Sequence, residues 1–241
     1  MLQAINLCKS YAEHEALKNL NLTVAPGEVY CLLGANGAGK TTTINLFMNF
    51  IQPSSGKVLV NSINVNTHAK DAKKQIAYIP ENLQLYGNLS GLENLRFFAG
   101  LGGKEPDKES AQNLLISVGL QNSAINKRVS KYSKGMRQKV GIAIAKAKKA
   151  NCLIMDEPTS GLDPEASNEF ANLLQEMRGN QVAILMATHD LFRAKESGTH
   201  IGIMKSGELI HSIKSDEITL QELEQLYLET MRVDNYAEAN H

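Results

Sequence analysis

Eight consecutive residues, Gly34-Ala35-Asn36-Gly37-Ala38-Gly39-Lys40-Thr41, match the pattern G-x-x-x-x-G-K-[ST] in full. A glycine-rich segment of this kind points several backbone N–H groups at one spot beside the positive end of a helix dipole. It can therefore bind an anion such as the β- and γ-phosphates of a nucleotide. Lys40 adds a mobile cation, and the Thr41 hydroxyl is placed to ligate Mg²⁺. The motif predicts a nucleoside triphosphate site that extends to Thr42.

Two adjacent carboxylates follow a second apolar run. Cys152-Leu153-Ile154-Met155 has the character of a buried strand, and Asp156 and Glu157 end it. Strands often end in acidic residues, but in a chain with an intact phosphate loop this pair is typical of a Walker B element. Asp156 would then hold Mg²⁺ through water, and Glu157 would polarise the water that attacks the γ-phosphate.

Short apolar runs bounded by turn residues predict the buried strands that must position these motifs. The run Val29–Leu33 leads into the glycine-rich loop, and residues 42–50 continue from it as a helix. Further strands are predicted at 20–24, 57–60, 76–79, 152–155, 182–187 and 201–204. Between residues 83 and 150 the periodicity becomes helical, with a break at 100–107, and an acidic helical stretch follows at 220–231. The pattern favours an α/β fold in which a helical insertion interrupts a parallel sheet and a helical tail closes the chain.

Composition and charge exclude several classes of function. The 241 residues carry 25 Lys and Arg against 25 Asp and Glu, so no overall field attracts nucleic acid and no nucleic-acid partner is expected. No apolar stretch approaches the roughly 20 residues that span a bilayer, and the N-terminus lacks the pattern of a signal peptide. Cys8, Cys31 and Cys152 are odd in number and lie in apolar contexts, which indicates reduced core thiols in a cytosolic protein.

Four further segments stand in order around these two motifs. Tyr132-Ser133-Lys134-Gly135-Met136-Arg137-Gln138 places a Ser and a Gly at a helix start, where a hydroxyl and backbone N–H groups can meet a second anion. Ser160-Gly161-Leu162-Asp163 follows the carboxylate pair, Ala187-Thr188-His189-Asp190 follows an apolar strand, and Tyr11 precedes the phosphate loop. In this order they resemble the signature motif, D-loop, switch histidine and adenine-stacking aromatic residue of the ABC ATPases. The resemblance covers essentially the whole chain.

The resemblance implies a P-loop NTPase fold. This fold has a RecA-like parallel-sheet core with N-terminal antiparallel strands, an inserted α-helical subdomain and a C-terminal helix. A single domain over residues 1–241 is expected. Residues 1–82 and 151–214 would form its ATP-binding core, residues 83–150 its helical signature subdomain, and residues 215–241 its helical tail.

The resemblance also implies a head-to-tail dimer that sandwiches two ATP molecules. The signature of one copy would reach the γ-phosphate held by the other, and Asp163 would link the two sites. The signature residues are Ser133, Lys134, Gly135 and Met136. The implied catalytic residues of ATP hydrolysis are Lys40, Glu157 and His189, and the implied Mg²⁺ ligands are Thr41 and Asp156. A histidine packed in the core at a strand end is the rival interpretation of His189.

Two positions depart from the family pattern. Lys134 stands where the family has the first glycine after the signature serine, which keeps the backbone donors and adds a cation. Glu81 occupies the Q-loop position, where a carboxylate can ligate Mg²⁺ but cannot donate a hydrogen bond as the usual glutamine does. Both departures resemble the ATP-binding subunits of the ABC-2 type, which act with a separately encoded permease, mostly in export.

This subgroup implies a place on the cytoplasmic face of the inner (plasma) membrane, with Leu83–Phe98 gripping the cytoplasmic helices of the permease. Internal packing of the helical insertion explains the apolar residues of that segment equally well. A cytosolic ABC ATPase with soluble partners is the runner-up function. A GTPase is disfavoured because Asn126-Lys127-Arg128-Val129 lacks the aspartate of the guanine-binding motif. The transported substrate and the permease are not encoded in any of these motifs.

Overall fold

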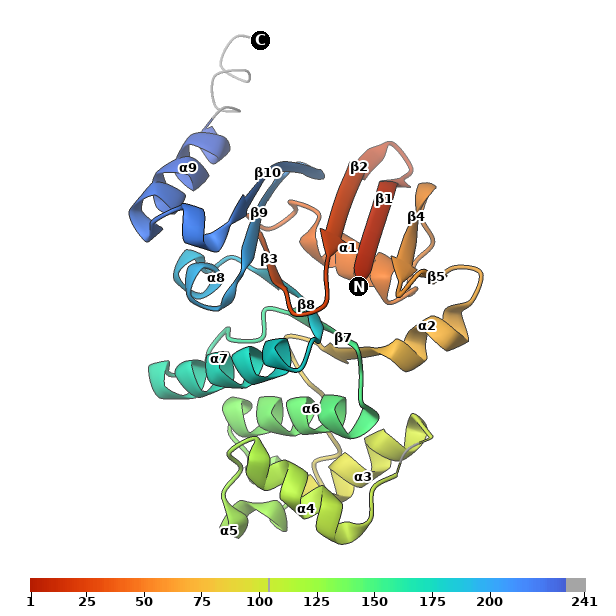
Figure 1. The fold of residues 1–241 in the computed structure, drawn as a ribbon, viewed down its shortest axis with the longest axis vertical. Coiled ribbons are helices and arrows are strands. Elements are labelled where there is room, and N and C mark those ends of the chain that lie inside the picture. Colours follow the sequence, from red (N-terminus) through yellow and green to blue (C-terminus); the bar gives the residue numbers. More distant parts are fainter. Residues whose placement is uncertain (104, 233–241) are drawn as a thin grey trace.

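The phosphate loop leaves the third strand of a six-stranded sheet. The computed structural model describes residues 1–103 and 105–232, and within it the strand order of this sheet is β10-β9-β3-β8-β7-β6 (Figure 1). The strands are β3 (Val29–Leu33), β6 (Ile76–Ile79), β7 (Cys152–Asp156), β8 (Ala183–Thr188), β9 (His200–Lys205) and β10 (Glu208–Lys214). All neighbours pair in parallel except β10, which is antiparallel to β9. The carboxyl ends of the parallel strands therefore meet at one edge, the usual ligand edge of such a sheet.

A second, antiparallel sheet holds the N-terminus. Its order is β2-β1-β4-β5. The strands are β1 (Leu2–Tyr11), β2 (His14–Val24), β4 (Ser55–Val60) and β5 (Ile63–Asn64). The tight turn between β1 and β2 pairs Tyr11 with His14. This turn contributes residues to the phosphate-loop cavity described below.

Helices cover both faces of the larger sheet and form a layer of their own. They are α1 (Lys40–Phe47), α2 (Ala69–Gln75), α3 (Gly91–Leu101), α4 (Lys108–Ser117), α5 (Asn122–Ile125), α6 (Lys134–Lys148), α7 (Pro164–Gly179), α8 (Leu191–Ser197) and α9 (Leu220–Arg232). Short 3₁₀ turns lie at Val129–Lys131 and Ser215–Glu217. Helices α3 to α6 lie at the end of the molecule farthest from the antiparallel sheet, and α6 packs against α7 and β6 (Figure 1).

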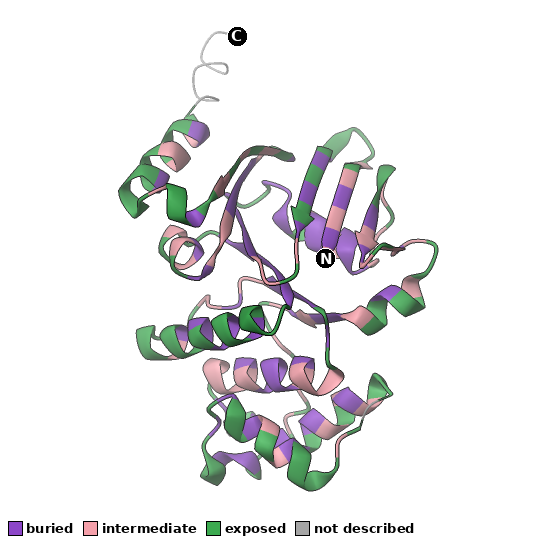
Figure 2. Ribbon diagram, viewed as in Figure 1, coloured by how far each residue is buried: buried purple, intermediate pink, exposed green. Residues whose placement is uncertain are grey.

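The core lies on both faces of the parallel sheet. Strands β3 and β8 are buried along their whole length (Figure 2). Val29, Cys31 and Leu33 of β3 pack into one cluster with the helical layer, whereas Tyr30 and Leu32 pack into another with α1 and the antiparallel sheet. Burial on both faces explains why these strands read as continuous apolar runs rather than as alternating ones.

The expected α/β fold is confirmed. Each predicted strand is present, and 20–24 and 57–60 are the ends of longer strands. The helix expected at 42–50 begins two residues earlier and ends at Phe47. Of the tail expected at 215–241, α9 spans Leu220–Arg232, and residues 233–241 lie outside the described part of the chain.

One expectation about the cysteines is wrong. Cys31 and Cys152 are buried and free, as expected, but Cys8 is only half-buried. The Sγ atom of Cys8 accepts a hydrogen bond from the Asn19 backbone N–H at 3.2 Å, beside an irregularity in the β1–β2 pairing. Within the described residues no helix has both the length and the apolarity needed to cross a lipid bilayer.

Candidate nucleotide-binding site

The glycine-rich loop connects the carboxyl end of β3 to the first turn of α1. Gly39 caps that helix with φ at 104°, a left-handed conformation, and a Cβ there would lie 2.9 Å from the Ala16 carbonyl oxygen. A Cβ at Gly34 would lie 2.6 Å from the Met204 carbonyl oxygen. Both positions therefore require glycine, because backbone from elsewhere in the fold approaches the loop closely.

The Lys40 side chain folds back over this loop. Its Nζ donates to the carbonyl oxygens of Gly34 and Ala35, the latter at 3.2 Å, and the residue is buried. Burial lowers the pKa of the Lys40 ammonium, and the neighbouring Glu157 and Asp156 carboxylates partly offset that shift. The ammonium is thus held at the centre of the loop, next to the two acids of β7.

Asp156 and Glu157 reach the same edge of the sheet from β7. Asp156 Oδ2 accepts a hydrogen bond from Thr41 Oγ1 at 3.2 Å. Burial raises the pKa of Asp156 above its ordinary value of 3.8, the Thr41 hydrogen bond opposes the shift, and the charges of Glu157 and Glu81 add to it. These contacts bring together the two residues expected to hold Mg²⁺.

Glu157 pairs with the histidine that follows β8. Glu157 Oε1 lies 2.9 Å from His189 Nδ1. The His189 side chain is 61% exposed, so the interpretation of this residue as a core histidine is wrong. The backbone of Glu157 has φ at +44°, a left-handed conformation that is unfavourable for a residue other than glycine.

A cavity of about 340 Å³ unites most of the predicted site. Its lining holds residues 35–42, Tyr11, Glu81, Asp156 and Glu157. His14 and Ala16, from the start of β2, also line it and were not predicted from the sequence. The pairing of β2 with β1 brings them beside Tyr11. Recognition of a hairpin directly after Tyr11 would have indicated that they lie near it.

The oxygen atoms at this cavity fit Mg²⁺. The Thr41 hydroxyl and the Asp156 carboxylate lie within hydrogen-bonding distance of each other, and Mg²⁺ prefers such hard oxygen ligands. No group of three or more His, Cys, Asp or Glu side chains is arranged to hold a metal ion anywhere in the described residues. The donor set therefore suits a cation that also needs ligands from the phosphates and water, as Mg²⁺ does.

The signature and D-loop residues lie apart from this cavity. Ser133 is the N-cap of α6, where its Oγ accepts from the Met136 backbone N–H at 3.2 Å. Asp163 is the N-cap of α7, where its carboxylate accepts from the Ala166 backbone N–H at 2.8 Å. Among the described residues that line the cavity, none belongs to either motif. Within one chain both residues have a structural role, because each satisfies a free N–H group at a helix start.

A larger apolar groove of about 650 Å³ lies between the sheet and the helical layer. Its apolar lining includes Leu83, Leu85, Phe98, Leu101 and Ile144. Lysines Lys70, Lys73, Lys74 and Lys148 also line it. Leu101 is 71% exposed and ends helix α3.

The segment Leu83–Phe98 has a buried part and an exposed part. Leu92 and Leu95 are buried inside the helical layer. Tyr86 and Phe97 are exposed, and their rings make an edge-to-face contact with centroids 5.0 Å apart. Internal packing therefore accounts for one part of the segment, and an apolar surface remains on the other.

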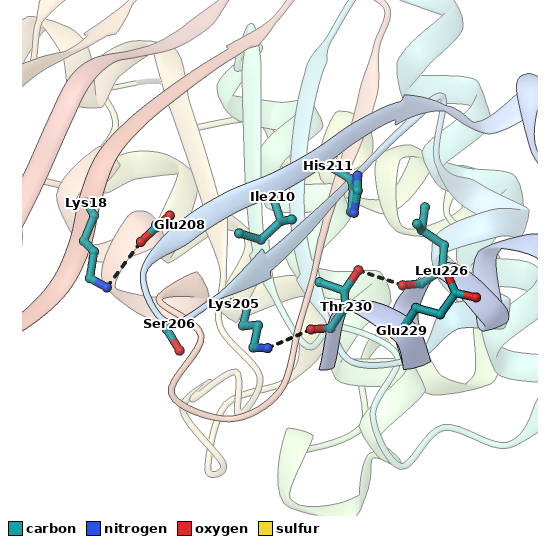
Figure 3. Close-up of a pocket in the computed structure, with 9 residues that line it drawn as sticks. All are labelled: Lys18, Lys205, Ser206, Glu208, Ile210, His211, Leu226, Glu229 and Thr230. Atoms are coloured by element: carbon teal, nitrogen blue, oxygen red, sulfur yellow. Dashed lines mark hydrogen bonds and ion pairs between the residues drawn. The ribbon is translucent and has the colours of Figure 1, made fainter. Parts of the chain in front are cut away.

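A third groove, of about 590 Å³, lies between β10 and α9 (Figure 3). Lys18 Nζ lies 3.3 Å from Glu208 Oε1, and Lys205 Nζ donates to the Thr230 carbonyl oxygen at 2.8 Å. None of its described lining residues belongs to a motif identified in the sequence. Its cationic groups are engaged with the protein, so the groove does not compete as the nucleotide site.

Replacing Asp156 by Asn is expected to raise the melting temperature of the nucleotide-free protein by about 2 to 4 °C at pH 7. The fold disfavours ionisation of this carboxyl, so the wild type loses stability as the pH rises through the raised pKa. The gain should shrink as the pH falls toward 3.8, the ordinary value. Thermal denaturation across this pH range tests it. Asp71→Asn is the control, because the hydrogen bond from Lys74 lowers the pKa of Asp71, so this substitution should lower the melting temperature. A higher melting temperature in both variants would contradict the explanation.

Comparison with known proteins agrees with the geometry. A family model described as ABC transporter matches residues 17–160. The chain is 38% identical over 227 residues to the uncharacterized ABC transporter ATP-binding protein YxlF of Bacillus subtilis, covering 93% of this chain and 73% of that protein. It is 34% identical over 230 residues to the bacitracin transport ATP-binding protein BcrA of Bacillus licheniformis, covering 95% of this chain and 74% of that protein.

Solved structures of ATP-binding cassettes share the fold. An ATP-binding subunit of an ABC transporter superimposes with a TM-score of 0.84 at 29% identity, covering 96% of this chain and all of that one. The cassette MJ0796, solved as a dimer bound to ADP and phosphate, superimposes with a TM-score of 0.79 at 25% identity, covering 89% of this chain and 99% of that one.

Proposed function

Because the chain belongs to the ABC transporter family of ATP-binding proteins, we propose that it hydrolyses ATP, with Mg²⁺, to power a separate membrane permease in export. The observation that carries the proposal is the convergence of the phosphate loop, Asp156 and the Glu157–His189 pair at one edge of the sheet. The relative named for bacitracin transport supports a role in transport.

The roles of the site residues follow from their positions. The backbone N–H groups of the phosphate loop and the Lys40 ammonium bind the β- and γ-phosphates. Bound by Thr41 and Asp156, Mg²⁺ would neutralise charge on the phosphate oxygens. Glu157 orients and polarises the attacking water, and His189 holds the Glu157 carboxylate in place through its Nδ1 atom. Catalysis then depends mainly on positioning and charge neutralisation, as is general for phosphoryl transfer.

A second copy of the chain completes the site in this proposal. The signature residues lie outside the cavity of their own chain, which leaves them for the nucleotide of another protomer. Ser133 and Gly135 would then bind the γ-phosphate in trans together with Lys134 and Met136, and Asp163 would connect the two sites. The dimeric cassette bound to ADP and phosphate supports such an assembly.

The apolar groove is the proposed docking site of the permease. Its exposed apolar residues suit the buried side of an amphipathic helix, and its exposed lysines Lys70 and Lys73 suit acidic residues or anionic lipid headgroups beside it. In this proposal the chain lies on the cytoplasmic face of the membrane. In functional units, residues 1–82 and 151–214 bind ATP, residues 83–150 carry the signature and the docking surface, and the tail from residue 215 has no assigned role.

Affinity purification of the tagged chain from detergent-solubilised membranes of its host, followed by mass spectrometry, tests the transport function. A stoichiometric polytopic membrane protein is expected. Recovery of soluble partners alone would contradict transport and would favour the cytosolic ATPase with soluble partners. ATP hydrolysis by the purified chain, measured separately, tests the ATPase assignment independently of transport.

Tyr11→Ala is expected to lower the affinity for ATP and for ADP about tenfold or more, whereas Tyr11→Phe should keep both affinities. Tyr11 is 46% exposed at the mouth of the cavity, and a base stacked on an aromatic ring typically contributes about 1–3 kcal/mol. Equilibrium titration with each nucleotide gives the affinities. Equal affinities in the Ala and Phe variants would show that the ring does not stack on the base.

A further inference from the structure

We propose that Glu81 makes the site selective for metal-complexed nucleotide by adding a third carboxylate where the phosphates bind. The inference rests on the proposed ATP-binding function. Glu81 follows β6 and lines the same cavity as Asp156 and Glu157. The three acids therefore face one small volume from two neighbouring strands.

A hydrogen bond ties the Glu81 carboxylate to the loop that follows β7. Ser160 Oγ donates to Glu81 Oε1 at a long distance of 3.5 Å. The exposed Glu81 carboxylate is therefore tied to the loop that continues from the other two acids, beside the cavity that all three line.

The cationic groups do not balance these acids. Among the described lining residues, Lys40 is the single lysine or arginine, set against three carboxylates. The phosphate loop and Lys40 attract the phosphates, but the three carboxylates repel a triphosphate that carries no bound cation. A triphosphate complexed with a divalent cation is repelled less. A glutamine at position 81 would be neutral and would not distinguish the two forms of the nucleotide in this way.

The test is equilibrium binding of ATP, by calorimetry, in excess MgCl₂ and in excess EDTA. The measured quantity is the ratio of the dissociation constant in EDTA to the dissociation constant in MgCl₂. Glu81→Gln is expected to lower this ratio about tenfold, mainly through tighter binding of metal-free ATP, for one unit charge removed a few ångströms from the phosphates. Glu81→Asp keeps the charge and Ser160→Ala removes only the hydrogen bond, so both should keep a ratio near that of the wild type. Because salt screens the repulsion between Glu81 and the phosphates, raising the ionic strength should lower this ratio more in the wild type than in Glu81→Gln.

The outcomes separate this inference from the function on which it rests. An unchanged ratio in Glu81→Gln, with ATP still bound in MgCl₂, overturns the inference and leaves ATP binding intact. A fall in Glu81→Asp as large as that in Glu81→Gln also overturns it, because the effect would then come from shape rather than charge. Absence of ATP binding by the wild type in MgCl₂ overturns the proposed function itself. Glu81 is exposed, so both changes at this position should leave the melting temperature close to that of the wild type.

Discussion

Glu157→Gln is expected to lower steady-state ATP hydrolysis by about 10²- to 10⁴-fold, the usual contribution of a general base, while ATP affinity changes little. Gln has the shape of Glu but cannot take up a proton from water. The substitution also keeps the unusual backbone at φ +44°, since neither residue is favoured there over the other. Fold stability should therefore be close to that of the wild type.

The same variant should accumulate as an ATP-bound dimer, because the step that separates the two copies is blocked. Phosphate release gives the turnover, and size-exclusion chromatography with and without MgATP gives the oligomeric state. Glu165→Gln is the matched control, since Glu165 is an exposed acid in the first turn of α7. Undiminished turnover in Glu157→Gln would show that another group polarises the water.

Leu101→Glu is expected to reduce recovery of the permease with the tagged chain about tenfold or more, the loss typical of an anchor residue at the centre of an interface. Leu101 lines the apolar groove and is 71% exposed, so a charge there meets the partner and leaves the core of this chain undisturbed. Quantitative comparison of purifications from detergent-solubilised membranes provides the measurement.

The control for this prediction is Ile116→Glu. Ile116 is 46% exposed on α4 and is not among the described lining residues of the groove. It should leave recovery of the permease unchanged, and both variants should keep ATP binding in isolation. Equal recovery with Leu101→Glu and the wild type would place the permease elsewhere on the chain.

The central strands were predictable because burial on both faces leaves a continuous apolar run, as in Val182–Ala187. The edge strand β10 was not predicted, because its residues alternate between half-buried and exposed and its run Glu208–Lys214 contains four polar residues. Helix α7 was also missed, although Asp163 and Pro164 form a recognisable helix start. Its exposed face is rich in polar residues, and these separate the apolar residues of the buried face along the sequence, so the helical periodicity is difficult to recognise.

The site follows the same physical division. The phosphate loop and the carboxylate pair could be found in the sequence because each motif is contiguous and its spacing carries the chemistry. The Glu157–His189 contact joins residues from two strands, and only the parallel order of β7 and β8 brings them to 2.9 Å. The contribution of His14 and Ala16 depends likewise on how the β1–β2 hairpin folds over the loop.

The helix caps and the backbone of Glu157 have opposite consequences for how this chain can drift in evolution. Ser133 and Asp163 stabilise helix starts, a contribution of about 1 kcal/mol each, so a descendant that no longer hydrolysed ATP would still retain them for folding. Glu157 holds a left-handed conformation in which glycine or asparagine is more stable. Under relaxed selection Glu157 would be replaced early. Its presence is therefore stronger evidence for an active enzyme than the presence of an intact signature motif.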